Sequence, residues 1–229
     1  MTEIATSAPE YVVGIPRGVL VSSGWLPQVG FTPMSGRDPI LSSLRFIRRE
    51  RESKVRADAE YDETFQQLAV FMVIKNRDGK FLLVEDAHTE ERLQGTWSLG
   101  LGEHCDSKDF SLRDTFDRAI REELEIRSNQ ERISYDTNSA KGLREKISMF
   151  IHTKFVGVIR DERDAVGRSH IGAIWIVKPK GNIELIPQVE EKAYRYLSIQ
   201  EIDARVSLNG WSDIILREIL KPTGVSMDV

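Results

Sequence analysis

The chain has 229 residues, of which 40% are hydrophobic and 30% are charged, and its formal net charge is −4. These values are typical of a globular domain with room for a substantial core, and the nearly balanced charge provides no general attraction to nucleic acids or anionic membranes. The single cysteine, Cys105, excludes an internal disulfide and a zinc cluster built from thiolates. No stretch approaches the ~18 consecutive apolar residues of a membrane span, and the N-terminus lacks the features of a signal peptide, so we expect a cytoplasmic protein.

Three parts are expected along the chain: an N-terminal arm or extension packed on the domain at residues 1–62, the main domain at residues 63–222, and a tail at residues 223–229. Within the arm, Tyr11–Pro16 has the pattern of a short strand, and Asp38 before Pro39 predicts the start of a helix. The basic stretch at residues 45–56 is interpreted as a solvated helix face rather than a nucleic-acid contact.

The main domain alternates strand and helix patterns. Two apolar runs flank an Asp78-Gly79 turn, which predicts a hairpin over residues 67–87. Further strands are predicted at Trp97–Leu101, at residues 147–160 and at residues 170–179, the last two as a hairpin or meander. Helices are predicted at Ser111–Ile126, at residues 198–204 and at residues 211–220. This mixture indicates an α/β (α+β) fold in which helices cover a mixed sheet.

The central helix has an apolar stripe with a spacing of four residues, formed by Leu112, Phe116, Ile120 and Leu124. Glu122, Glu123 and Glu125 lie outside this stripe, and Arg118 precedes Glu122 by one turn. Clustered carboxylates repel one another unless a cation lies between them, and hard oxygen ligands suit Mg²⁺ or Mn²⁺. From the helix alone, a solvated acidic face and a metal site both remain open.

The segment before the helix, Gly100-Leu101-Gly102-Glu103-His104, ends a predicted strand in a glycine turn, and the acidic Asp106 and Asp109 follow. Strand, glycine turn, acidic residue and acidic helix in this order resemble the motif of the Nudix hydrolases. That motif reads Gly, five residues, Glu, seven residues, then Arg-Glu-U-x-Glu-Glu-x-Gly-U, where U is aliphatic.

The motif fits the helix in two registers. In the first, Arg121-Glu122 is the Arg-Glu pair, Glu125 takes a metal position, and Glu123 occupies the aliphatic position. In the second, Arg118 is the arginine, Glu122-Glu123 is the Glu-Glu pair, and Glu125 replaces the glycine.

The apolar stripe favours the second register, because the first would place Glu123 in the core, and an unpaired buried carboxylate is costly. The second register places Ile120 in the core and Ala119 where the family has a metal-binding Glu. We therefore expect Glu122 and Glu123 to line a cleft with Gly102 at its edge. We also expect a Glu introduced at position 119 to reach the same cation.

The resemblance spans about Tyr11 to Leu220. Three segments are similar to a bacterial branch of predicted Nudix phosphoesterases: "RLQGTWSLGLGEH", "FVGVIRDERDAVGRSHIGAIW" and "WSDIILREIL". It implies a Nudix α/β/α sandwich with a mixed sheet, a smaller antiparallel sheet and helices on both sides. It also implies Mg²⁺- or Mn²⁺-dependent hydrolysis of a phosphorylated, nucleotide-like substrate, a nucleoside diphosphate linked to a further group, and it leaves a homodimer open.

Site roles follow from the resemblance. The metal ligands would come from Glu122, Glu123, Asp109 and Glu125, while Arg118 would orient the carboxylates and Glu190 would act as a base. Substrate contacts would come from Gly102, His104, Arg92 and His170. Each role has a plainer alternative: a surface ion pair for Arg118, a solvated loop for Glu190 and Arg92, and a packed, hydrogen-bonded side chain for His170. The function is thus either Nudix hydrolysis or, because Ala119 replaces a ligand, binding of a nucleotide-like ligand or a protein partner by a catalytically impaired Nudix fold.

Overall fold

The computed structural model describes residues 9–34, 45–86, 95–135, 139–189 and 193–222. Seven strands form the main sheet: β1 (Tyr11–Pro16), β2 (Gly30–Pro33), β3 (Glu52–Val55), β4 (Phe65–Ile74), β7 (Leu101–His104), β10 (Ile151–Arg160) and β11 (His170–Pro179). Their order is β2-β10-β11-β4-β1-β3, and β7 also pairs with β4. The sheet is mixed, as expected, because β11 runs parallel to β4 while the other pairs are antiparallel. The segment expected to be an arm therefore supplies strands to the main sheet.

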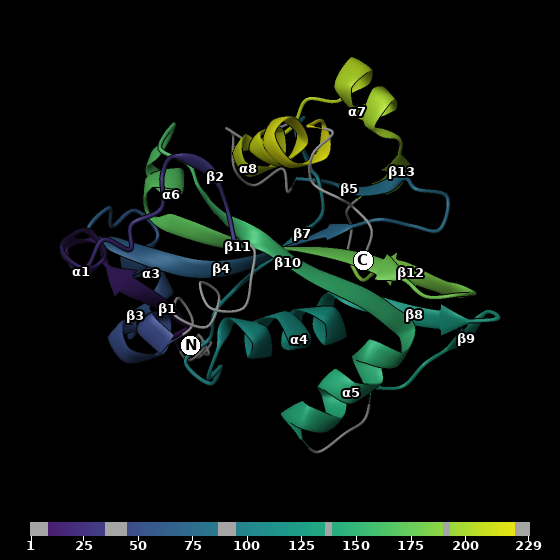
Figure 1. Cartoon of the computed structure of the whole chain (residues 1–229), viewed down its shortest axis with the longest axis horizontal. Helices are drawn as coiled ribbons and strands as arrows, with labels where there is room; N and C mark the ends of the chain where they lie inside the picture. Colours follow the sequence, from purple (N-terminus) through teal and green to yellow (C-terminus); the bar gives the residue numbers. More distant parts are fainter. Residues whose placement is uncertain (1–8, 35–44, 87–94, 136–138, 190–192, 223–229) are drawn as a thin grey trace, which may run out of the picture.

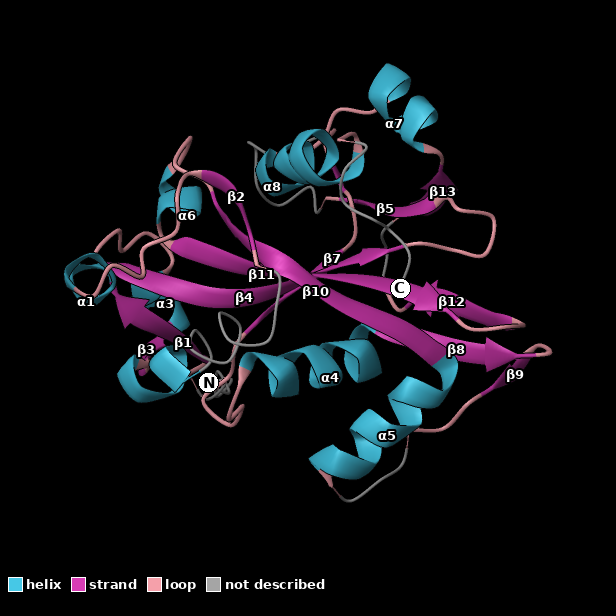
Figure 2. Cartoon of the chain, in the orientation of Figure 1, coloured by secondary structure: helices cyan, strands magenta, loops and turns pink. Residues whose placement is uncertain are grey.

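Two smaller antiparallel sheets complete the strands. One contains β8 (Leu124–Ser128), β9 (Glu131–Arg132) and β12 (Ile183–Pro187), and the other contains β5 (Phe81–Glu85), β6 (Trp97–Ser98) and β13 (Tyr194–Leu197). The three-layer arrangement is visible in Figures 1 and 2: α4 (Leu112–Glu123) and α5 (Ala140–Phe150) lie below the main sheet, and α7 (Ile199–Arg205) and α8 (Gly210–Ile214) lie above it. A π-helical segment, η2 (Ile215–Leu220), continues α8. Three further short helices are α1 (Arg17–Ser22), α3 (Arg56–Ala59) and α6 (Ala165–Arg168). The predicted α/β/α sandwich is confirmed.

The central strand β4 is buried along its whole length, and its side chains alternate between two cores. Val70 and Met72 belong to the core shared with α4 and α5, whereas Phe71 and Val73 belong to the core shared with α7, α8 and η2. Successive side chains of a strand point to opposite faces of a sheet. Burial on both faces therefore explains why β4 reads as a continuous apolar run.

The hairpin predicted over residues 67–87 is only half correct. The tight turn is present, because the Asn76 N–H donates to the Lys80 carbonyl at 2.8 Å and Gly79 has a φ of +79°. The strand after the turn, β5, nevertheless pairs with β13 and β6 rather than with β4. Both edges of β4 are already occupied, by β11 on one side and by β1 and β7 on the other.

The strand expected at Trp97–Leu101 is interrupted at Gly100, which separates β6 from β7. Gly100 has a φ of +128°, and a Cβ at this position would lie 2.0 Å from the carbonyl oxygen of Met72. Only glycine fits here without displacing the backbone of β4. The interruption lets β7 leave the small sheet and pair with β4.

Helix α4 begins after Ser111, whose side chain accepts a hydrogen bond from the Asp114 N–H, and it ends at Glu123 rather than at Ile126. Phe116, Ile120 and Leu124 are each 0% exposed, which confirms the expected core stripe. The chain then turns directly into strand β8, where Leu124–Ile126 pairs with β12. This sheet pairing ends the helix early, and its long-range origin explains why local periodicity did not predict it.

Other expected elements are largely confirmed. Strand β1 has the predicted bounds, the pair β10–β11 is antiparallel, and α7 and α8 form near the C-terminus. Residues 147–150 were predicted as strand but complete α5, a helix that the sequence patterns did not indicate. The helix start at Asp38 and Pro39 lies outside the described residues. Among the helices that the structure describes, none is both long enough and apolar enough to cross a bilayer.

Candidate active site

A cleft of about 390 Å³ lies where β7, the C-terminal end of α4 and the start of β11 come together. Its lining includes Gly102, His104, Glu123 and His170, four residues that belong to these three elements. The end of β5, the segment after β10 and residues 209–211 supply other walls. Elements that are far apart in the sequence thus line one cleft.

The described lining of the cleft is strongly acidic. It contains seven carboxylate residues, Glu60, Glu85, Asp86, Glu103, Glu123, Asp161 and Asp164, and one basic residue, Arg56. Arg118 and Arg163 bind Glu103 and Asp161, respectively, but the acidic residues still outnumber the basic ones. An anionic ligand would be repelled by such a surface unless cations bind with it.

Arg118 organises the wall between α4 and β7. Its Nη2 donates to Oδ2 of Asp109 at 2.9 Å and to the carbonyl of His104 at 2.7 Å, while its Nη1 lies 3.1 Å from Oε1 of Glu103. The i,i+4 pair with Glu122 is also present, at 3.2 Å. Burial lowers the pKa of the guanidinium, but the hydrogen bonds and charges of Asp109 and Glu103 outweigh it and hold this pKa above its ordinary value. Arg118 therefore does more than form the surface ion pair that its spacing alone would explain.

The acidic residues of α4 have different surroundings. Glu123 lines the cleft, whereas Glu122 is exposed, pairs with Arg118 and Arg121, and is not part of the described lining. Ala119 is fully buried in the core shared with α4 and α5, so the expectation that this position faces the cation is wrong. The helix turns its 119 position toward the sheet, because residues 116, 119 and 120 share one face. The burial of Ile120 agrees with the second register.

Two further predicted metal ligands lie away from the cleft. Asp109 is 8% exposed, binds Arg118, and accepts a hydrogen bond from the Asp106 N–H at 3.0 Å. Glu125 belongs to strand β8 and forms ion pairs with Arg127 and Arg132. Neither side chain is brought next to Glu123 in the cleft lining. The early end of α4 explains the position of Glu125, which would remain on the helix surface if the helix continued.

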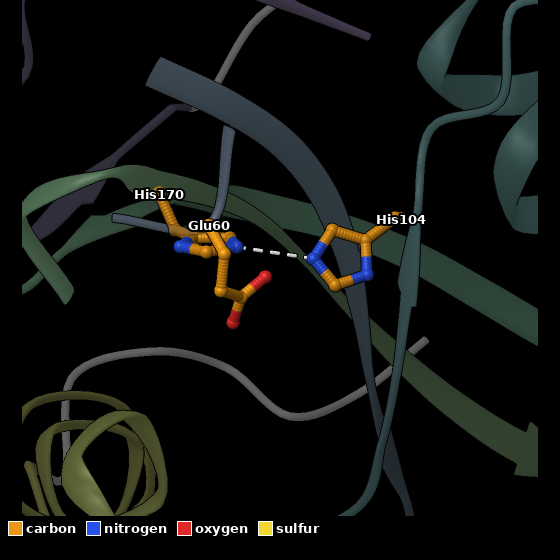
Figure 3. A group of neighbouring side chains, drawn as sticks. All are labelled: Glu60, His104 and His170. Carbon is orange, nitrogen blue, oxygen red and sulfur yellow. Dashed lines mark hydrogen bonds between the residues drawn. The ribbon is translucent and has the colours of Figure 1, made fainter. Parts of the chain in front are cut away.

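His104 and His170 meet on the cleft wall, although 66 residues separate them in the sequence. Their Nε2 atoms are 3.0 Å apart, and Glu60 at the end of α3 brings a carboxylate oxygen to the same place. Figure 3 shows this carboxylate beside the line that joins the two rings. The three ligand atoms lie within 4.8 Å of one another. His170 is thus both packed and hydrogen-bonded, and it also lines the cleft.

The surroundings of His104 favour its neutral form. Burial lowers the pKa of this imidazole to about 3, and the neighbouring His170, Arg56 and Arg118 contribute in the same direction. A neutral imidazole keeps a lone pair on one ring nitrogen. The unprotonated nitrogen of the ring can therefore accept a hydrogen bond or bind a metal ion.

Some predicted residues cannot be placed, and one important residue was not predicted. Arg92 and Glu190 lie outside the described residues. Glu60 lies in the stretch assigned to the N-terminal arm, and no local pattern marked it as functional. The long-range pairing of β3 with β1 and of β1 with β4 brings this stretch to the cleft.

Comparisons with known proteins agree with this architecture. The NUDIX domain family matches residues 65–219. Protein YmaB of Bacillus subtilis (strain 168) is 29% identical over 173 residues, which cover 70% of this chain and 74% of YmaB.

Among solved structures, that of Tm1382, a candidate Nudix hydrolase, superimposes with a TM-score of 0.62 and 19% sequence identity. The match covers 90% of this chain and 96% of Tm1382, and at this identity it concerns the fold. The family match covers more than half of the chain, and the fold is that of the family. The chain belongs to the Nudix family.

Proposed function

We propose that this protein is a metal-dependent Nudix hydrolase that cleaves a phosphoanhydride in a nucleoside diphosphate linked to a further group. The observation that carries the proposal is the acidic cleft bounded by β7 and the end of α4, with Glu123 and Glu103 in its wall. Because the lining carries many carboxylates, a diphosphate would bind there together with divalent cations rather than alone.

The donor set of the cleft fits Mg²⁺. Glu123 and Glu103 offer carboxylate oxygens, the hard ligands that Mg²⁺ prefers, and the open cleft leaves room for the waters that this ion usually keeps. Bound Mg²⁺ would neutralise the diphosphate and make an attached water more acidic. Arg118 would hold Glu103 in place through the ion pair between Nη1 and Oε1.

Hydrolysis requires one water molecule. Its oxygen forms a bond to phosphorus, the bond from that phosphorus to the bridging oxygen breaks, and the water proton passes to a carboxylate base. The products are a nucleoside monophosphate and the phosphorylated second group. Glu190 remains the predicted base, and the described residues contribute mainly by positioning and charge stabilisation.

The proposal is tested by incubating the full chain with a panel of nucleoside diphosphates linked to sugars, alcohols and second nucleotides. Products are separated by anion-exchange chromatography after incubation in Mg²⁺, in Mn²⁺ and in EDTA. We expect turnover of at least one linked diphosphate with either metal and none in EDTA. Binding of these compounds without turnover in either metal would instead support the impaired, binding-only Nudix fold.

A further inference from the structure

The two cleft histidines have an arrangement that a simple hydrogen-bonded pair does not require. Nδ1 of His170 lies 2.6 Å from the carbonyl oxygen of Val166, which can only accept a hydrogen bond. Nδ1 must therefore carry the proton, and in the neutral ring Nε2 carries the lone pair. That lone pair points toward Nε2 of His104 at 3.0 Å.

Ser169 fixes this geometry from behind. The residue is fully buried, and its hydroxyl lies 3.0 Å from Nδ1 of His170 and 2.8 Å from the carbonyl oxygen of Glu60. One side chain thus joins the backbone of Glu60 to the ring of His170. Metal-binding histidines usually donate the second ring N–H to an oxygen in this way, which sets the tautomer and the ring orientation.

We propose that Glu60, His104 and His170 form a binding site for a divalent transition-metal ion such as Zn²⁺, in addition to the carboxylate site for Mg²⁺. Two imidazoles and one carboxylate are ligands that suit Zn²⁺ and its neighbours in the first transition row. Mg²⁺ prefers oxygen ligands, so this set would discriminate against it.

The ligand spacing suits such an ion after a small adjustment. Two imidazole nitrogens bound tetrahedrally to zinc lie about 3.3 Å apart, given Zn–N bonds of about 2.0–2.1 Å. The two nitrogens therefore need to separate by a few tenths of an ångström from their 3.0 Å spacing, and the rings need to turn so that both lone pairs converge on the ion. The ion would take the place of the hydrogen bond between the two Nε2 atoms, with the proton of the neutral His104 ring on Nδ1 so that both Nε2 atoms offer lone pairs.

All three ligand residues line the cleft, so the protein surrounds the ion from one side. The remaining coordination positions would be open to water or to an oxygen of a phosphorylated ligand, as in zinc sites with three protein ligands. A cation here would also offset part of the acidic charge of the lining. The proposal does not depend on hydrolysis, because binding of the metal is measured without substrate.

The test uses the full chain after treatment with a chelator. Zn²⁺ binding is measured by calorimetry, and Co²⁺ is used as a spectroscopic probe, because its visible absorption reports imidazole ligands in a site of low coordination number. We expect one tight site in the unaltered protein. His104→Gln and Glu60→Gln should each lower the affinity for Zn²⁺ by more than about 100-fold, since loss of an outer partner alone typically costs ~10–100-fold.

Two variants serve as controls. His152→Gln alters an exposed histidine on β10 and should leave Zn²⁺ affinity and the Co²⁺ spectrum unchanged. Glu123→Gln alters the carboxylate assigned to Mg²⁺ and should also leave both unchanged. Thermal unfolding without metal checks that each variant is folded.

Absence of tight Zn²⁺ binding would overturn the proposal and leave a hydrogen-bonded histidine pair only. Retention of full affinity in both His104→Gln and Glu60→Gln would also overturn it, because the ion would then bind elsewhere. Loss of the Co²⁺ spectrum in Glu123→Gln but not in His104→Gln would place the ion at the carboxylate site instead. If the unaltered chain binds Zn²⁺ as expected but hydrolyses none of the linked diphosphates, the result counts against the proposed function and not against this metal site.

Discussion

Arg118 and Asp109 form a two-point ion pair that joins helix α4 to the loop before it. The Nη2–Oδ2 distance is 2.9 Å and the Nε–Oδ1 distance is 3.3 Å. The side chain of Asp109 is 9% exposed and that of Arg118 is 21% exposed, so water screens the pair only in part. The same guanidinium holds Glu103 in the cleft wall. Structural support and the arrangement of the site therefore depend on one arginine.

Replacement of Arg118 by Ala should lower the free energy of unfolding by about 2–3 kcal/mol, because it leaves the Asp109 carboxylate without its cation. Arg118→Lys should recover only part of this, since lysine cannot form the two-point contact. Arg121→Ala is the matched control: this exposed side chain also pairs with Glu122, and its loss should cost less than about 1 kcal/mol. Urea denaturation measures all three values, and equal losses for Arg118→Ala and Arg121→Ala would contradict the assigned role.

A carboxylate introduced at position 119 should destabilise the protein whether or not metal is present. Ala119 is 0% exposed, so Ala119→Glu inserts both volume and charge into a packed core, and we expect a loss of more than about 3 kcal/mol. The control is Ala140→Glu, the same substitution at an exposed position in the first turn of α5, where it should have little effect. Melting temperatures in EDTA and in Mg²⁺ compare the two. A gain in stability for Ala119→Glu in Mg²⁺ would show that this position faces the cation after all.

Glu123 should account for most of the stabilisation by Mg²⁺. Binding to the folded state at about 100 times the dissociation constant adds about 2.7 kcal/mol, which for a chain of this size raises the melting temperature by roughly 5–10 °C. Glu123→Gln should remove most of this increase. Glu125→Gln should preserve it, because Glu125 lies on β8 and pairs with Arg127. The same increase in all three proteins would mean that Mg²⁺ binds outside the cleft.

Cys105 should resist thiol reagents as long as the protein is folded. Burial raises the pKa of this thiol to about 12, and the hydroxyl of Thr115 lies 3.3 Å from its sulfur. At pH 8 the folded protein should therefore contain almost no thiolate at this position, and the thiolate is the reactive form. Because Cys105 is the sole cysteine, labelling by an aromatic disulfide reagent reports it alone. We expect labelling only after addition of urea, and rapid labelling without urea would show that the segment opens.

The sequence predicted the parts of this protein that local chemistry determines. The spacing of Phe116, Ile120 and Leu124 predicted the buried face of α4, and the Asp78-Gly79 turn was correctly located. Pairing choices were not predictable in this way, because whether β5 joins β4 or β13 depends on which strand edges other segments already occupy.

The candidate site shows the same division. Glu123 and Gly102 were found because they belong to one contiguous motif. Glu60 was not found, because its approach to His104 and His170 is created by long-range strand pairing rather than by spacing along the chain. The burial of Ala119 was not predicted, because position 119 lies three residues from the buried Phe116 and three residues from the exposed Glu122. Helix spacing alone therefore fits either environment.

The central claim is that the carboxylates between β7 and α4 support metal-dependent hydrolysis, and turnover of the best linked diphosphate by three proteins tests it most directly. These are the unaltered chain, Glu123→Gln and Glu125→Gln, each assayed in Mg²⁺ by release of the nucleoside monophosphate. The account predicts that Glu123→Gln lowers kcat/KM by at least about 100-fold, a barrier increase of about 2.7 kcal/mol, while Glu125→Gln stays within about twofold of the unaltered chain. Full activity of Glu123→Gln, or a larger loss in Glu125→Gln, would contradict it.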